Sequence, residues 1–110
     1  MSRSRFDDIR DKIIRHIENT LSYCEGMTQD DFDTNLMFQE ACIFNVLQVG
    51  ELAAKVIDLE LDTEYPEIEW RQMRGMRNRI VHDYDGVHMD IVWNTIQCDF
   101  PKLLEQLGSI

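Results

Sequence analysis

The sequence is short of the residues that interrupt helices and tighten turns. It holds two prolines and five glycines in 110 residues, and these two residue types are the strongest local breakers of regular structure. No segment alternates apolar and polar residues with a period of two, which is the pattern of a half-buried strand. The shortage therefore predicts a few long helices, and the length predicts a single domain over residues 1–110.

Positive charge is also scarce. Eleven Lys and Arg residues stand against 21 Asp and Glu residues, so the formal net charge is −10 at pH 7. A protein that coats nucleic acid over its whole surface needs a basic surface, and this balance excludes that class. It leaves open a single site at which a few arginines gather.

Paired cysteines and long apolar runs are absent as well. Cys24, Cys42 and Cys98 are an odd, widely spaced set with no Cys-x-x-Cys pair, which argues against a disulfide framework or a zinc cluster and predicts reduced, core-type thiols. The apolar stretches fall far below the roughly 20 residues needed to span a bilayer, and the N-terminal segment carries charges instead of a signal-peptide core. We expect a soluble, cytoplasmic protein.

The first half of the chain carries two stretches with apolar residues at helical spacing. The first covers residues 6–24 and ends before Gly26. Thr28, three residues before Asp31, predicts a helix cap that restarts the chain. The second stretch covers about 35–60, and its expected core-facing side is Leu36, Ile43, Leu47, Gly50, Ala54 and Ile57.

The second half carries two more such stretches. One is expected to begin near Pro66 and Glu67, with the proline in the first helical turn, and to run to about residue 83. The last covers about 88–107 and contains Pro101, which predicts a kink or a split of that helix. Together the four stretches predict an all-α, up-and-down bundle of four to five helices.

The positive charge is concentrated in one segment. This segment has a charge of +4, from Arg71, Arg74, Arg77 and Arg79, with no acid between residues 71 and 82. The rest of the chain carries −14, which brings the total to −10. We expect a phosphate group to be attracted to this segment before any other.

Placed on a helix, this segment has two faces. At about 100° per residue, the apolar face holds Trp70, Met73, Met76 and Ile80, and the opposite face holds Arg71, Arg74, Asn78 and His82. Arg77 projects on the apolar side, where a guanidinium needs a partner or an interface because an unpaired buried charge costs several kcal/mol. Arg77 and His82 lie about 140° apart, so one regular helix does not aim both at one point. They converge if the helix ends near His82, or if a second copy of the chain supplies half of the site.

The same segment resembles a known motif. Arg77, His82 and Tyr84 have the spacing Arg-x4-His-x-Tyr, and Asn78 is a polar residue directly after the arginine. This pattern is similar to that of the HepT-like toxins in the HEPN superfamily of all-α ribonucleases. Further likenesses extend over most of the chain: the first amphipathic helix, Gly50-Glu51, Trp70, Gly75-Met76, Val92-Trp93-Asn94-Thr95-Ile96 and Pro101.

The resemblance implies metal-independent cleavage of RNA at a composite site where the two protomers of a homodimer meet. His82 would move a proton to or from the ribose 2′-hydroxyl or the leaving oxygen, because an unperturbed imidazole exchanges protons near pH 6.5. Arg77 would hold the scissile phosphate and the charge that builds on it. Asn78 and Arg74 would support these two residues, with neither metal nor cofactor bound to this chain.

Regulation is implied by the same resemblance. The HepT-like proteins are toxins of a type VII-like toxin–antitoxin system, and the antitoxin is a nucleotidyltransferase that uses ATP to attach AMP to the motif tyrosine, here Tyr84. A nucleotide attached two residues from His82 would block the site and bring a phosphate close to Arg77.

Each of these residues also has an ordinary structural interpretation. An arginine such as Arg77 on an apolar face is typical of a core or interface pair with an acid, and Glu51 is one acid that it could meet. His82 is typical of a helix C-terminus, Tyr84 of a half-buried boundary position, and the other arginines of a solvated face. The alternative function is a non-catalytic helical module that sequesters a nucleotidyltransferase partner or a nucleotide, which the overall acidity favours.

Overall fold

The computed structural model describes residues 3–82 and 88–110, and this part of the chain contains helices and no β-strand. In chain order the elements are α1 (Arg5–Tyr23), α2 (Gln29–Asp33), α3 (Leu36–Asp58), the 3₁₀ turn η1 (Asp62–Glu64), α4 (Trp70–His82), α5 (Met89–Asn94), the π-helical segment η3 (Thr95–Asp99) and α6 (Phe100–Gly108). The predicted all-α fold of four to five helices is confirmed, since α5, η3 and α6 follow one another as a single arm. None of the described helices is long and apolar enough to cross a membrane.

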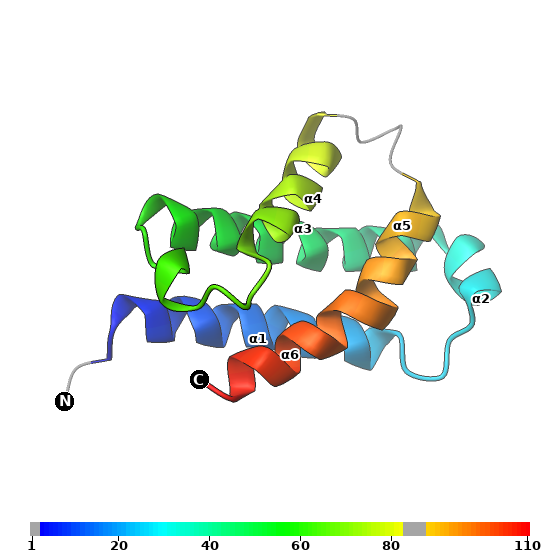
Figure 1. Cartoon of the computed structure of the whole chain (residues 1–110). Helices are drawn as coiled ribbons and strands as arrows, with labels where there is room; N and C mark the ends of the chain where they lie inside the picture. The colour runs from blue at the N-terminus through cyan, green and yellow to red at the C-terminus, as the bar shows by residue number, and fades with distance from the viewer. Residues whose placement is uncertain (1–2, 83–87) are drawn as a thin grey trace.

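Helix α3 is the centre of the arrangement. It packs along α1 on one side and against α4 on another (Figure 1). In the arm formed by α5, η3 and α6, the first part contacts α2 and α3, whereas α6 contacts α1. Helix α4 is therefore held mainly by α3, and its position depends on how closely these two helices approach each other.

Capping boxes begin α1 and α2. The Ser4 hydroxyl accepts the N–H of Asp7 at 3.0 Å, and the Asp7 carboxylate accepts the N–H of Ser4. Thr28 and Asp31 make the same reciprocal pair at 3.1 and 3.0 Å, which confirms the predicted cap. Because these hydrogen bonds favour the charged form, they lower the pKa of both carboxyl groups. Gly26, with φ of +75°, takes the left-handed conformation in the turn between the two helices.

Helix α4 begins at Trp70, four residues after the predicted start at Pro66, so the placement of Pro66 in the first helical turn is wrong. The proline instead occupies the second position of a turn, which the N–H of Ile68 closes on the carbonyl of Tyr65 at 3.2 Å. The indole N–H of Trp70 donates to the same carbonyl at 3.1 Å. Ile68 and Trp70 are both buried, and the turn brings Ile68 into the core before the helix starts.

The sequence predicted a kink or a split of the last helix at Pro101, and the structure shows an interruption of the α-helix directly before this residue. Pro101 is the second residue of α6, and the five residues before that helix, Thr95–Asp99, are π-helical. A proline has no N–H with which to continue an α-helical ladder, and a local change of hydrogen-bonding pattern accommodates its absence.

The core lies between α1, α3 and the arm. Its most completely buried side chains are Phe32, Phe100, Ile13, Ile17, Ile96, Leu107, Val49, Val56, Val92, Thr20 and Cys42. Leu36, which was expected to face the core, is 68% exposed. The fully buried residues of α3 begin only at Cys42, so the first turn of the helix projects beyond the core.

Two of the three cysteines are buried thiols as predicted, and the third is not. Cys24 and Cys42 are reduced and buried, with their Sγ atoms 3.9 Å apart. Their contact lowers the pKa of the Cys24 thiol, whereas the contact and burial raise that of Cys42. Cys98 is exposed, which corrects the expectation of three core-type thiols, because the buried positions of η3 are Thr95 and Ile96.

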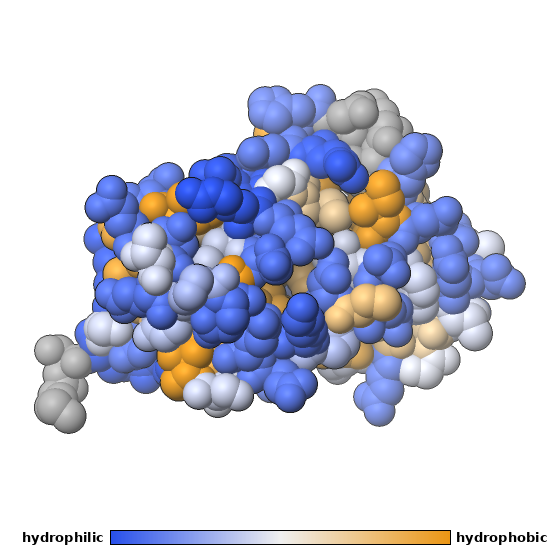
Figure 2. Space-filling model, in the orientation of Figure 1, coloured by the Kyte–Doolittle hydropathy of each residue, from blue (hydrophilic) through white to orange (hydrophobic). Residues whose placement is uncertain are grey.

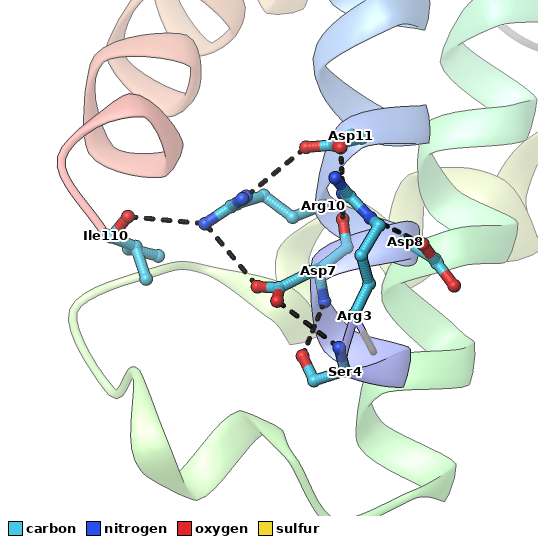
Figure 3. A network of polar contacts seen from close by, with 7 residues as sticks. All are labelled: Arg3, Ser4, Asp7, Asp8, Arg10, Asp11 and Ile110. Atoms are coloured by element: carbon cyan, nitrogen blue, oxygen red, sulfur yellow. Dashed lines mark hydrogen bonds and ion pairs between the residues drawn. The ribbon is translucent and has the colours of Figure 1, made fainter. Parts of the chain in front are cut away.

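A polar network joins the start of α1 to the C-terminus (Figure 3). Arg3 donates to Asp8 at 3.0 Å and is also paired with Asp11. Arg10 donates to the carbonyl of Ile110 at 3.2 Å, which holds the end of the chain against α1. Two of the few basic residues are therefore engaged with acids or backbone at the start of α1, outside the basic segment of the sequence.

Candidate functional site

Arg77 lies where α4 crosses α3, on the apolar side of α4 as predicted. Its Nη1 donates to Glu51 Oε1 of α3 at 3.1 Å, so the arginine has the acidic partner that its position required. The Arg77 side chain is 24% exposed and that of Glu51 is 47% exposed. Arg77 Nε is buried and has no hydrogen-bond partner among the described residues.

Gly50 determines how closely the two helices approach at this point. A Cβ atom built on Gly50 would lie 2.4 Å from Arg77 Cβ and 2.8 Å from the Met73 carbonyl oxygen. No side chain fits there unless the helices move apart. Gly50 thus allows Arg77 to pack closely against α3, and Glu51, the next residue, is its ion-pair partner.

His82 is exposed at the end of α4. The helix includes both Arg77 and His82, so the two side chains leave it about 140° apart, with Arg77 directed toward α3. The described part of one chain does not bring them together. Asn78 is exposed and Arg74 is half-buried, and neither forms an ion pair or a side-chain hydrogen bond within the described ranges. Tyr84 lies outside the described residues.

The positive charge of α4 is partly neutralised. Arg71 is paired with Asp62 at 3.3 Å, and Arg77 is paired with Glu51. Arg74 and Arg79 have no such partner in residues 3–82 and 88–110. In this basic segment, two arginines therefore have no acid among the described residues to offset their charge, whereas the charge of Arg77 is partly offset by Glu51.

A hollow of about 540 Å³ lies beside α4, between that helix and the arm. Its lining includes Met76, Arg79, Asp90 and Asn94, and Figure 2 shows apolar residues at its floor with hydrophilic residues around it. Within the described residues, no three His, Cys, Asp or Glu side chains are grouped so that they could hold a metal ion.

Sequence reasoning missed large apolar side chains that are exposed on the outer side of α3 and at the end of α4. Met37 is 79% exposed, Phe44 56% and Val81 57%. Met37 and Phe44 are seven residues apart and so share one side of α3. That spacing was the available signal, but the apolar residues on the opposite side of this helix concealed it. An exposed patch of this kind marks an interaction surface in many proteins.

Comparison with known proteins identifies the family of the chain. Residues 13–110 match the model of the family described as "Ribonuclease HepT-like". The chain is 34% identical over 103 residues to the "Probable ribonuclease HepT" of Thermococcus cleftensis, and the match covers 94% of this chain and 92% of that protein.

Two further relatives differ in how much of their length is covered. "Putative RNase TTE0752" of Caldanaerobacter subterraneus subsp. tengcongensis is 28% identical over 102 residues, which is 86% of this chain and 90% of that protein. "Gamma-glutamylcyclotransferase and putative RNase MJ0434" of Methanocaldococcus jannaschii is 33% identical over 98 residues, 89% of this chain but only 44% of that longer protein. No solved structure matches the chain. By its match over residues 13–110, the chain belongs to the HepT-like ribonuclease family.

Proposed function

We propose that the protein is the toxin of a type VII-like toxin–antitoxin pair, a ribonuclease that cleaves RNA without a metal ion at a site shared by two protomers. The observation that carries the proposal is the disposition of Arg77 and His82 in a chain of this family. Both motif residues lie on one regular helix, but they project about 140° apart. A second protomer is the simplest way to place an arginine and a histidine on one phosphate.

The chemistry follows from these two side chains. The 2′-hydroxyl of the ribose attacks the adjacent phosphorus, the bond to the 5′-oxygen breaks, and a 2′,3′-cyclic phosphate is left. His82 takes the proton of the attacking hydroxyl or gives one to the leaving oxygen. Arg77 binds the phosphate oxygens on which negative charge develops. Asn78 and Arg74, one helical turn or less from Arg77, orient the histidine or the phosphate. DNA is not cut, because it lacks the attacking group.

The exposed apolar side chains of α3 and α4 support a homodimer. Met37 and Phe44 lie on the same outer side of α3 as Glu51. Val81 is exposed on α4, next to His82 in sequence. A second copy that covers these side chains removes them from water and brings its own α4 close to that of the first protomer. The basic and acidic groups beside them, including Arg74, then form the wall of the shared site.

Regulation by a partner completes the proposal. A nucleotidyltransferase antitoxin attaches AMP to Tyr84, using ATP that this chain does not itself bind. Because Tyr84 is two residues beyond His82 in sequence, the added nucleotide obstructs the histidine. The intact mass checks this step, because each AMP adds about 329 Da to the chain.

The test of the cleavage is a reaction in EDTA. Purified unmodified protein is incubated with a single-stranded RNA, and the fragments are examined for 2′,3′-cyclic phosphate ends. Arg77→Ala and His82→Ala are expected to be folded, dimeric and inactive. Cleavage that requires added metal, or that persists in both variants, contradicts the proposal. A folded wild-type dimer that binds a nucleotidyltransferase and cuts no RNA supports the binding module instead.

Mixing the two inactive variants tests the shared site. If each site takes Arg77 from one protomer and His82 from the other, half of the dimers in an equal mixture contain one intact site. The mixture should then regain about a quarter of the wild-type activity. The two variants are unfolded and refolded together so that protomers exchange, and a mixture that is then as inactive as its components shows that both residues act within one chain.

A further inference from the structure

The structure contains one polar contact that fixes the orientation of the Arg77 guanidinium. The stem of the side chain lies against Gly50, where the helices are too close for a Cβ atom, so the first part of the side chain has little freedom. Nε is buried and unpaired among the described residues, which leaves the contact between Nη1 and Glu51 as the fixed polar interaction of the group. Rotation about the last torsions of Arg77 is therefore limited by Glu51.

This contact also determines which atoms of the guanidinium remain for a ligand. Nη1 uses one of its N–H groups on Glu51 at 3.1 Å, and Nε is inaccessible. Nη2 forms no hydrogen bond to another side chain or to the backbone within the described residues. Since a guanidinium is planar, fixing Nη1 fixes the plane in which Nη2 presents its donors.

Glu51 has a second, opposite effect. Its negative charge lies 3.1 Å from the arginine nitrogen, and it weakens the attraction of Arg77 for a phosphate group. The side chain is 47% exposed, so water screens the effect without removing it. Orientation and charge can be separated experimentally, because glutamine keeps the acceptor oxygen and loses the charge.

We propose that Glu51 is the positioning residue of the phosphate-binding arginine: it holds the plane of the Arg77 guanidinium at the cost of some affinity for RNA. The proposal rests on the proposed function, in which Arg77 binds the scissile phosphate. Glu51 acts through Arg77 and does not touch the reacting atoms. The preceding residue, Gly50, contributes to the same arrangement, because the close approach of the two helices at this glycine sets the distance between the Glu51 and Arg77 side chains.

Three variants separate the two effects in the RNA cleavage assay. Glu51→Gln is expected to keep kcat within about threefold of the wild type. Its KM should fall about threefold, because removing one negative charge about 7 Å from the phosphate in a solvated site raises the affinity for RNA by about that factor. Glu51→Ala should lose ten- to a hundredfold in kcat, the scale of a misplacement by about 1 Å. Glu51→Asp, one methylene too short, should also lose kcat. Circular dichroism melting and molecular mass establish that each variant is a folded dimer.

Glu18 supplies the control. It is an exposed glutamate on α1, outside the α3 surface proposed to form the dimer, and it has no ion pair or side-chain hydrogen bond in the described residues. Glu18→Gln and Glu18→Ala should therefore leave kcat unchanged. Wild-type kcat in Glu51→Ala overturns the proposal, and so does an equal loss in Glu51→Gln and Glu51→Ala, because that result assigns the effect to the charge and not to the orientation.

A second readout does not depend on catalysis. In a ¹H–¹⁵N spectrum of the arginine side chains, assigned with Arg77→Lys, the buried Nε–H of Arg77 should be protected from exchange with water. The signal should persist in Glu51→Gln and be lost in Glu51→Ala. If the wild-type protein cuts no RNA, the proposed function fails while this spectrum still decides the positioning role. An unchanged signal in Glu51→Ala contradicts that role.

Discussion

The substitution Gly50→Ala tests the contact on which the candidate site depends. The new Cβ atom would lie 2.4 Å from Arg77 Cβ and 2.8 Å from the Met73 carbonyl oxygen. Ordinary contact between such atoms begins at about 3.4 Å, so α3 and α4 must separate by about 1 Å. Neither obstructing atom is the flexible end of a side chain, and the strain is therefore shared by both helix backbones.

The expected free energy of this change has two parts. Overpacking of a rigid contact costs up to about 3 kcal/mol. Replacing a glycine inside a helix by alanine returns about 1 kcal/mol, because alanine loses less backbone entropy on folding. The net expectation is a loss of about 2 kcal/mol in the free energy of unfolding, which lowers the Tm of a chain this size by roughly 8 °C.

Urea unfolding followed by circular dichroism measures this loss, with the protein concentration held fixed because formation of the proposed dimer would be coupled to folding. Gly75→Ala is the matched control. Gly75 lies within α4, and no atom lies within 4 Å of its added Cβ, so alanine there should stabilise the protein by up to about 1 kcal/mol. If Gly50→Ala is as stable as Gly75→Ala, the close packing of α4 against α3 at Gly50 is refuted. The cleavage rate should also fall in Gly50→Ala and stay unchanged in Gly75→Ala.

Two further predictions concern polar groups that stabilise the fold. The pKa of the Asp31 carboxyl is lowered by its capping hydrogen bonds. Its contribution to stability is therefore complete above the usual carboxyl pKa of about 4 and is lost as the pH falls through the lowered value. The urea midpoint should drop less between pH 5 and pH 3 in Asp31→Asn than in the wild type, and equal drops contradict the cap. Asn45 is buried, donates to the Ala41 carbonyl at 3.0 Å and is bonded to His16 Nδ1 at 2.9 Å, so Asn45→Ala should cost about 1–3 kcal/mol in urea unfolding, and a loss below about 0.5 kcal/mol contradicts the pairing.

Much of the fold could be predicted because it depends on local patterns. The apolar spacing of residues 6–24 and 35–60 places α1 and α3 to within two residues of their observed ends. Thr28 is recognisable as a cap from the acid three residues later, and Pro101 as a break from its missing N–H. The start of α4 was misplaced because Pro66 is as favourable in a tight turn as in a first helical turn. Only the need to bury Ile68 decides between these two uses.

The site was predictable as a set of residues but not as an arrangement. The sequence shows that Arg77 lies on an apolar face and needs a partner, yet it does not choose among the chain's 21 acids. The choice of Glu51 depends on the crossing of α3 and α4, and this crossing depends on the absence of a side chain at Gly50. Similarly, the exposure of Phe44 reflects which side of α3 is left uncovered by the other helices, a property of tertiary packing that periodicity does not contain.

The π-helical segment in the last arm has a consequence for how this family can change in length. A π turn holds about one residue more than an α turn, and such a segment is what a single inserted residue leaves inside a helix. Here it lies between α5, which contacts α2 and α3, and α6, which contacts α1. Removing one residue from Thr95–Asp99 would restore a continuous α-helix and leave α6 in nearly the same orientation relative to α5, because five residues in a π turn and four residues in an α-helix complete almost the same rotation. The buried Leu103 and Leu107 would therefore still face α1, so relatives can lose a residue at this point without a change in the surface of α1 that meets α6.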